Sequence, residues 1–310
     1  MAPERSLHAL VVSGPFCLRI GVDYTPLESF LALAVKERPE VLIIFGPFLD
    51  ANNLRVSAGD TFLPGGDHEP CSVDDVYAYH VLPLLIRGLE PLRQASPATK
   101  VFIVPSLDDV LCSHPLPQPP LDAMLCGGPP AAEATAKRAR RSAATSSTLG
   151  SAMDQLKRVG VQFLPNPAHM EINGINVSLT SEDALSPVLR NLVLRPEGPK
   201  LDEALRLLLL QQGLFPVVPR DPARVCEERA AALDFPGGVL PDVCIFPSIT
   251  GIVKGTLVDD TIFVNPRSLC RPAALGTFAE LWLAPSTGGT RTSLSERFRV
   301  DSHRIGSRNL

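Results

Sequence analysis

The N-terminal half of the chain alternates short apolar runs with stretches of helical periodicity. The apolar runs cover residues 7–12, 41–45 and 101–104, and each ends at a turn signal that contains Gly or Pro. Short apolar runs bounded in this way predict buried strands. Strands that alternate with helices predict an α/β fold, in which crossover helices pack on a parallel sheet.

Helices are expected in the segments between these strands. Thr25 is expected as the N-cap of the first helix, with Glu28 at the acidic third position of a capping box. Ser72 is expected to cap a longer helix over residues 73–93. The sequence therefore predicts strand, helix, strand, helix, strand in its first third.

The second half of the chain predicts more strands and one hairpin. Residues 172–180 form two apolar stretches around Asn173 and Gly174, a strong short-range hairpin signal. A helix is expected over residues 202–212. Further strands are expected at 161–164, 243–246, 261–264 and 278–283.

Composition divides the chain into four segments. Residues 1–126 and 153–284 are expected to be two halves of one domain. Residues 127–152 and the tail 285–310 are poor in large apolar residues, so we expect both to be disordered, because too little surface is buried to offset the entropy of ordering.

The 127–152 segment carries a basic cluster of Lys137, Arg138, Arg140 and Arg141. Such a cluster is typical of a nuclear-import signal or a nucleic-acid patch. A solvated charge run in a loop is the equally weighted alternative.

Charge, cysteine spacing and hydropathy limit the kinds of partner and bound metal that the chain is expected to have. The chain has 29 Lys and Arg against 33 Asp and Glu, a net charge of -4, which is the wrong sign for a surface that grips phosphate backbones throughout. Its 7 cysteines show no C-x-x-C spacing, so neither a zinc ribbon nor a disulfide framework is indicated. We also expect no membrane partner, because no apolar stretch is long enough to span one.

Common catalytic and cofactor motifs are missing from the sequence. The phosphate-binding G-x-x-x-x-G-K, the dinucleotide G-x-G-x-x-G, the G-x-S-x-G elbow and H-E-x-x-H do not occur. We therefore expect no catalytic residue and no cofactor. Because ligands of parallel sheets gather beyond the carboxyl ends of the strands, the exits at Gly14, Gly46 and Ser106 are where a site would lie.

The framework of these exits resembles the calcineurin-like metallophosphoesterases, which hold two metal ions with D-x-H, G-D-x-x-D, G-N-H-D and late histidine motifs. Here the first exit has no carboxylate or histidine, the second has proline at the bridging carboxylate, and the third has leucine and aspartate in place of asparagine and histidine. The positions of this degenerate metal site are Gly14, Pro15, Pro47, Asp50, Ser106, Leu107, Asp108, Asp109, Pro247 and Ser248.

Two interpretations remain for Asp50, Asp108 and Asp109. They are either a weakened site for a hard cation or ordinary aspartates of turns and helix caps, and we favour the caps, so no metal is expected. The 6 histidines show no ligand spacing, and we expect surface or loop positions for them.

Several runs, in order, resemble the B-subunit family of eukaryotic DNA polymerase alpha. They are V-V-S-G-P-F at 11–16, R-P-E-V-L-I-I-F-G-P-F-L-D-A at 38–51, V-F-I-V-P-S-L-D-D-V at 101–110, P-Q-P-P at 117–120, L-P-N-P at 164–167 and I-N-G-I-N-V-S-L-T-S-E-D-A-L at 172–185. The resemblance extends over about residues 7–283, and the insertion at 127–152 is foreign to it.

The resemblance implies an inactivated phosphoesterase-type β-sandwich flanked by helices. It implies a scaffold that binds the zinc-bearing C-terminal region of the polymerase's catalytic subunit in the nucleus, with primase reached through that partner and DNA contacted indirectly or weakly. The family's N-terminal helical and oligonucleotide-binding domains are not expected here, since only six residues precede the first strand. Alternatives are a residual metal-dependent phosphodiesterase or nuclease, a nucleic-acid-binding module, and a small subunit of polymerase delta or epsilon.

Overall fold

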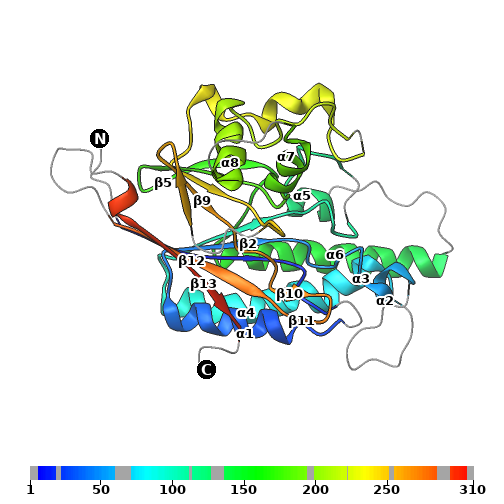
Figure 1. Ribbon diagram of the computed structural model, residues 1–310. Coiled ribbons are helices and arrows are strands. Elements are labelled where there is room, and N and C mark those ends of the chain that lie inside the picture. Colours follow the sequence, from blue (N-terminus) through cyan, green and yellow to red (C-terminus); the bar gives the residue numbers. More distant parts are fainter. Residues whose placement is uncertain are drawn as a thin grey trace.

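Two β-sheets lie face to face between two groups of helices (Figure 1). The computed structural model describes residues 6–18, 22–59, 71–111, 114–126, 136–193, 199–221, 223–250, 255–284 and 294–305, without the side chains of 136–143 and 295. Segments from both halves of the chain enter the larger sheet, because strands near the C-terminus pair with the first strand.

The larger sheet has the strand order β13-β12-β1-β2-β3-β4. Its strands are β1 (Leu7–Ser13), β2 (Val41–Phe45), β3 (Lys100–Val104), β4 (Val161–Phe163), β12 (Thr277–Leu283) and β13 (Phe298–Arg304). The first four are parallel neighbours in chain order, whereas β12 is antiparallel to β1 and β13 is antiparallel to β12. The parallel sheet predicted from the apolar runs is confirmed.

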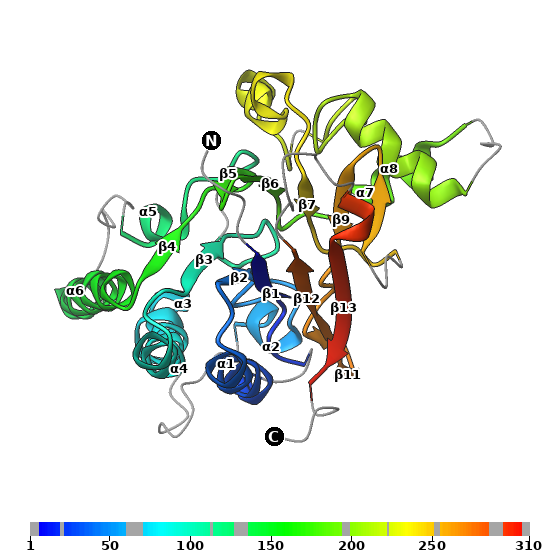
Figure 2. The same cartoon turned by 90° about the vertical axis from the view of Figure 1, so that its left-hand side faces the viewer.

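The helices that connect the parallel strands cover one face of this sheet (Figure 2). They are α1 (Thr25–Glu37), α4 (Leu82–Ala95) and α6 (Ala136–Arg158). The short α3 (Val73–Val76) and a π-helical stretch over Tyr77–Val81 lead into α4. Ser72 caps α3 as predicted, because its hydroxyl accepts the N–H of Asp75 at 3.2 Å.

The predicted capping box of α1 is wrong. Tyr24 holds the N-cap position, and Thr25 is already helical. The carboxylate of Asp23 accepts hydrogen bonds from the N–H of Thr25 at 2.9 Å and from its hydroxyl at 2.6 Å. An aspartate two residues upstream therefore orders the helix start that the threonine was expected to cap.

The smaller sheet has the order β5-β6-β7-β9-β8, and two helices cover its outer face. Its strands are β5 (Ala168–Ile172), β6 (Ile175–Leu179), β7 (Val243–Ile245), β8 (Thr256–Val258) and β9 (Thr261–Val264), and the helices are α7 (Leu185–Asn191) and α8 (Lys200–Leu210). The predicted hairpin is confirmed as β5 and β6, turned at Asn173 and Gly174, which both have positive φ.

Several short elements complete the description. They are α2 (Leu54–Ser57), α5 (Leu121–Cys126), β10 (Cys270–Arg271), β11 (Ala274–Leu275) and 3-10 turns at Glu227–Leu233, Pro236–Gly238 and Leu294–Glu296.

Successive side chains of the strands in the larger sheet point alternately into two different hydrophobic cores. In β1, Ala9 and Val11 face the smaller sheet, whereas Leu10 and Val12 pack against the helices. The same period of two holds in β2, which places Ile43 between the sheets. With a third cluster under α7 and α8, the layers run helix, sheet, sheet, helix. The predicted α/β class, with a β-sandwich flanked by helices, is confirmed.

The expectation of disorder across residues 127–152 is wrong for the described part of that segment. Helix α6 begins at Ala136 and continues to Arg158, and Leu149, Met153 and Leu156 are buried against the first core. The spacing of four and then three residues between them forms one apolar stripe. The composition argument failed because this stripe straddles the expected boundary. Residues 127–135 lie outside the described residues.

The expectation of a disordered tail is also wrong where the tail is described. Residues 298–304 form β13, which pairs with β12 from Phe298 opposite Leu283 to Arg304 opposite Thr277. Val300 is buried between the sheets. Leu294 is buried in the same core, and Phe298 packs against it. A count of large apolar residues missed this segment because a few anchored side chains and a ladder of backbone hydrogen bonds are enough to order it.

Candidate functional site

The carboxyl ends of strands from both sheets open into one cavity of about 940 Å³. It is lined by the exits of β1, β2 and β3, by Ser181 and Glu182 after β6, and by Pro247 and Ser248 after β7. Of the ten predicted positions of the degenerate site, all but Leu107 and Asp109 line this cavity. The structure therefore brings together residues that the sequence separates by more than two hundred positions.

Glycine allows the three strand exits to approach one another. A Cβ added to Gly14 would lie 2.1 Å from the carbonyl oxygen of Pro47, and one added to Gly46 would lie 3.2 Å from the Cβ of Ser106. The backbone ladder continues past the strand ends, since Gly14 N–H bonds to Phe45 O at 3.0 Å. Close backbone approach, not a ligand, requires glycine at position 14.

Asp109 lies behind the cavity wall and is fully committed to the protein. Its Oδ2 accepts the N–H of Phe48 at 2.7 Å, the N–H of Leu49 at 3.3 Å and the hydroxyl of Tyr77 at 2.6 Å. Its Oδ1 accepts the N–H of Leu111 at 3.1 Å. Burial raises the pKa of this carboxyl above its ordinary value. Asp109 thus ties the loop after β2 to the loop after β3.

Asp50 and Asp108 have turn roles at the cavity rim. The Oδ1 of Asp50 accepts the backbone N–H of Asn52 at 2.8 Å. Asp108 donates its own N–H to the hydroxyl of Ser106 at 3.2 Å, and its carboxylate lies 3.8 Å from the guanidinium of Arg224. These contacts are those of Asx and Ser turns, in keeping with the interpretation of the aspartates as turn and cap residues.

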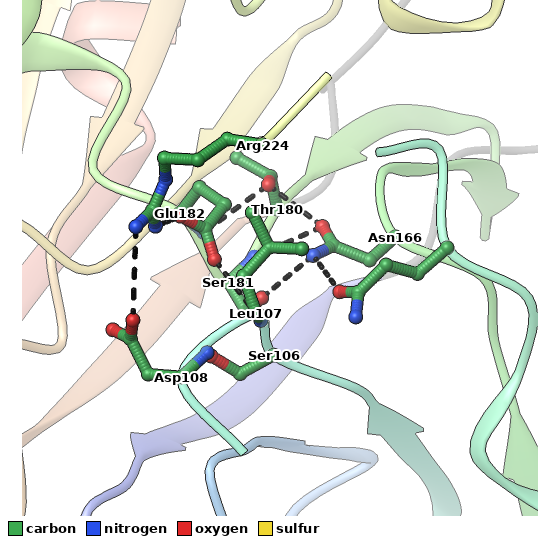
Figure 3. A network of polar contacts seen from close by, with 9 residues as sticks. Ser106, Leu107, Asp108, Asn166, Thr180, Ser181, Glu182 and Arg224 are labelled. Carbon is green, nitrogen blue, oxygen red and sulfur yellow. Dashed lines mark hydrogen bonds and ion pairs between the residues drawn. The ribbon is translucent and has the colours of Figure 1, made fainter. Parts of the chain in front are cut away.

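Glu182 and Arg224 are cavity residues that the sequence analysis did not single out (Figure 3). The buried carboxylate of Glu182 pairs with the guanidinium of Arg224 and accepts the N–H of Leu107 at 3.3 Å. Burial raises the pKa of Glu182, and Arg224 opposes that rise. The guanidinium lies between Glu182 and Asp108, so a fixed positive charge from the chain itself balances these carboxylates.

A signal for Glu182 was present in the sequence. The T-S-E-D run follows directly after the predicted hairpin, at the end of a strand that proves parallel to β7. Arg224 had no such signal, because it lies in a loop that follows no predicted strand and reaches the cavity only in the folded chain.

Two proline-containing runs named above meet beside the cavity in one polar network (Figure 3). Asn166 and Gln118 exchange backbone hydrogen bonds at 2.7 and 3.1 Å. The amide of Asn166 also donates to the side-chain oxygens of Gln118 and Ser181 and accepts the hydroxyl of Thr180. Asn166 thereby fixes the exit of β6, on which Glu182 is presented.

The described residues offer a group of metal-type donors elsewhere, not at this cavity. Within the part of the chain that is described, the one such group consists of Glu280, Asp301 and His303. The expectation that the histidines occupy surface or loop positions is wrong for His8, His169 and His303, which lie in β1, β5 and β13, and for His80, which lies in the π-helical stretch. His8 is only 6% exposed.

The basic cluster lies on helix α6 rather than in a disordered loop. The backbone of Lys137, Arg138, Arg140 and Arg141 is helical, and their side chains fall outside the described part of the structure. None of the described helices is long and apolar enough to cross a membrane.

Comparisons with known proteins relate the chain to one family. The family model for the B subunit of DNA polymerases alpha and epsilon matches residues 9–252. The chain is also similar to proteins named as the B subunit of DNA polymerase alpha. It is 29% identical over 308 residues to that of Mus musculus, and the match covers 96% of this chain and 44% of the relative.

The similarity extends to distant organisms at lower identity. The relative in Drosophila melanogaster is 25% identical, covering 97% of this chain and 42% of its own length. The one in Schizosaccharomyces pombe is 23% identical, covering 95% of this chain and 45% of its own length. The chain thus spans less than half the length of these relatives.

A solved structure, that of Chaetomium thermophilum Vps29, aligns with 96% of this chain and 98% of its own at 13% identity. Its TM-score is 0.34, and a likeness this low carries no conclusion.

Proposed function

The chain belongs to the B-subunit family of DNA polymerases alpha and epsilon, and from that premise we propose that it is a non-catalytic accessory subunit of the DNA polymerase alpha-primase complex, acting in the initiation of DNA replication. The relatives in mouse, fly and fission yeast bear the name of the alpha polymerase. This favours polymerase alpha over polymerases delta and epsilon as the partner enzyme.

The observation that carries the non-catalytic part of the proposal is the chemistry of the strand exits. Proline, leucine and serine occupy positions 47, 107 and 248, and none of them supplies the carboxylate or imidazole that bridges or holds a pair of divalent ions. The buried Asp109 has both oxygens engaged by backbone N–H groups and a tyrosine hydroxyl. A two-metal hydrolytic centre needs several such oxygens directed at the ions.

In this proposal the chain binds the zinc-bearing C-terminal region of the polymerase's catalytic subunit. Primase is held in the complex through that subunit. The family resemblance of the sequence runs supports this assignment. The net charge of -4 argues that DNA is contacted indirectly or weakly. A replication role implies action in the nucleus, and the basic cluster on α6 is a suitable import signal.

Co-purification tests the proposal. The full chain, tagged, is co-expressed with the C-terminal region of the catalytic subunit of polymerase alpha, and in parallel with the corresponding regions of polymerases delta and epsilon. We expect a stoichiometric complex with the alpha region only. Retention of the delta or epsilon region instead would reassign the subunit, and binding to none of the three would refute the scaffold role.

The competing enzyme function is tested on the same purified chain. We expect no Mn²⁺-dependent hydrolysis of a generic phosphodiester above a buffer control. Turnover that is lost in Asp50→Ala but kept in a variant remote from the cavity, Leu210→Ala, would contradict the non-catalytic assignment.

A further inference from the structure

Three adjacent strands present a cluster of histidines and carboxylates on the outer face of the larger sheet, away from the cavity. In the β1–β12 ladder Glu280 is opposite Leu10, and in the β12–β13 ladder it is opposite Asp301. His8 and His303 are each two residues along from these partners, so both lie diagonally beside Glu280 on the same face. Figure 2 shows the three strands side by side.

The side chains converge on the buried carboxylate of Glu280. Its Oε1 is 3.0 Å from Nε2 of His8, and its Oε2 is 2.8 Å from Nε2 of His303. Glu280 is only 3% exposed. One donor atom each from Glu280, Asp301 and His303 lie within 4.8 Å of one another. An imidazole and two carboxylates are thus held within reach of a single point.

This donor set suits a particular class of ion. Imidazole nitrogen and carboxylate oxygen bind Zn²⁺ at about 2.0–2.2 Å, which places neighbouring tetrahedral ligand atoms roughly 3.3 Å apart. Donor atoms that lie within 4.8 Å of one another need to move by about 1.5 Å at most to meet that spacing, which side-chain rotation can supply while the strands hold the backbone in place. Hard cations such as Ca²⁺ prefer all-oxygen sites and are disfavoured by the histidine.

The charge of the cluster also favours a cation. Glu280 and Asp301 place two carboxylates on neighbouring strands, directly opposite each other in the ladder. Like charges in that position repel, and a divalent ion between them removes the repulsion. The guanidinium of Arg299 lies 2.6 Å from Asp301, but it is largely exposed and so is readily released to solvent.

We propose that Glu280, Asp301 and His303 bind one divalent transition-metal ion of the Zn²⁺ class, with water completing the coordination and His8 positioning Glu280. The ion joins the edge strand β13 to β12 and so fastens the C-terminal segment to the sheet. His8 acts as the outer partner that ligating carboxylates commonly have.

The chain contains its own reporter for this site. Trp282 is the only tryptophan, and its indole stacks on the ring of His8 with centroids 3.6 Å apart. An open-shell ion such as Co²⁺ bound beside His8 would quench Trp282 fluorescence, whereas Zn²⁺ has a closed shell. Competition by Zn²⁺ then restores the emission.

The test is a fluorescence titration of the full chain, stripped of metal by a chelator, with Co²⁺. We expect saturable quenching at one ion per chain, reversed by Zn²⁺, and a visible spectrum of bound Co²⁺ without a thiolate charge-transfer band. We expect Asp301→Asn and His303→Gln to weaken Co²⁺ binding at least about 10-fold, and His8→Gln roughly 10-fold or more.

His169→Gln, a histidine on β5 outside the cluster, is the matched control and should bind as the wild type does. Circular dichroism and thermal melting establish that each variant is folded. Unsaturable quenching of the wild-type chain, a thiolate band, or unchanged affinity in both folded ligand variants would overturn the proposal. The wild-type titration and spectrum decide the matter even if a variant fails to fold.

Discussion

Replacing Asp109 with asparagine tests whether a former site residue now serves only the fold. The aspartate accepts four hydrogen bonds, from the N–H groups of Phe48, Leu49 and Leu111 and from the hydroxyl of Tyr77. Asparagine is nearly isosteric but offers one oxygen and one NH₂ group. In either orientation the NH₂ group faces at least one backbone N–H, donor against donor.

The cost follows from these contacts. A buried backbone donor left without an acceptor costs about 1–3 kcal/mol, and exchanging a carboxylate for a neutral acceptor weakens the other bonds by about 1 kcal/mol in total. We expect Asp109→Asn to lower the free energy of unfolding by about 2–4 kcal/mol, which corresponds to a fall in Tm of roughly 4–10 °C.

Asp108→Asn is the matched control one residue away. The side chain of Asp108 is 50% exposed and its contact with Arg224 is 3.8 Å, so its loss should cost less than about 1 kcal/mol. Urea unfolding followed by circular dichroism measures both variants. Equal stability of the two variants, or a wild-type Tm for Asp109→Asn, would refute the structural role of Asp109.

The pH dependence of stability, compared between the wild type and Asp109→Asn, gives a second test of the role of Asp109. Burial raises the pKa of Asp109 in the folded chain above its ordinary value of 3.8. A raised pKa means that the folded state binds the proton more tightly than the unfolded state, so the associated stability is full below 3.8 and is lost as pH rises through the folded pKa. The stability advantage of wild type over Asp109→Asn should therefore shrink with rising pH in that window, and an advantage that grows would contradict this.

Three further predictions concern packing and thiols. Gly14→Ala should lower the free energy of unfolding in urea by about 1–3 kcal/mol or more, because the added Cβ would lie 2.1 Å from Pro47 O. The control Gly150→Ala should leave that free energy unchanged or raise it, because its Cβ would meet nothing within 4 Å. Leu156→Ala should lower the free energy of unfolding by about 2–5 kcal/mol, because Leu156 is the fully buried residue by which α6 packs on the first core, and an unchanged midpoint would restore the view that this segment is disordered. Burial raises the pKa of Cys270 to about 12, and raises those of Cys17 and Cys244 further, so alkylation read by mass spectrometry should modify the exposed Cys126 before these three buried thiols. Early labelling of any buried thiol would count against that order.

Local pattern determined much of the fold. The apolar runs at β1, β2 and β3 and the Asn173-Gly174 turn are set by interactions among neighbouring residues, so their elements could be predicted from the sequence. The strand exits followed, because the ends of parallel strands must lie at one edge of a sheet. The substitution of Pro47, Leu107 and Ser248 for ligands was likewise visible as residue identity alone.

Tertiary contact decided the rest. Helix α6 and strand β13 depend on contacts with other segments of the chain. Leu156 of α6 packs in the first core, and β13 forms its backbone hydrogen bonds with β12. The same holds for Arg224 beside Glu182 and for His8 and His303 around Glu280, whose residues are separated by 42, 272 and 23 positions. The sequence determines which side chains are available. Pairing between distant segments then determines which of them are buried next to each other, and charged groups interact strongly only once that pairing has brought them close together.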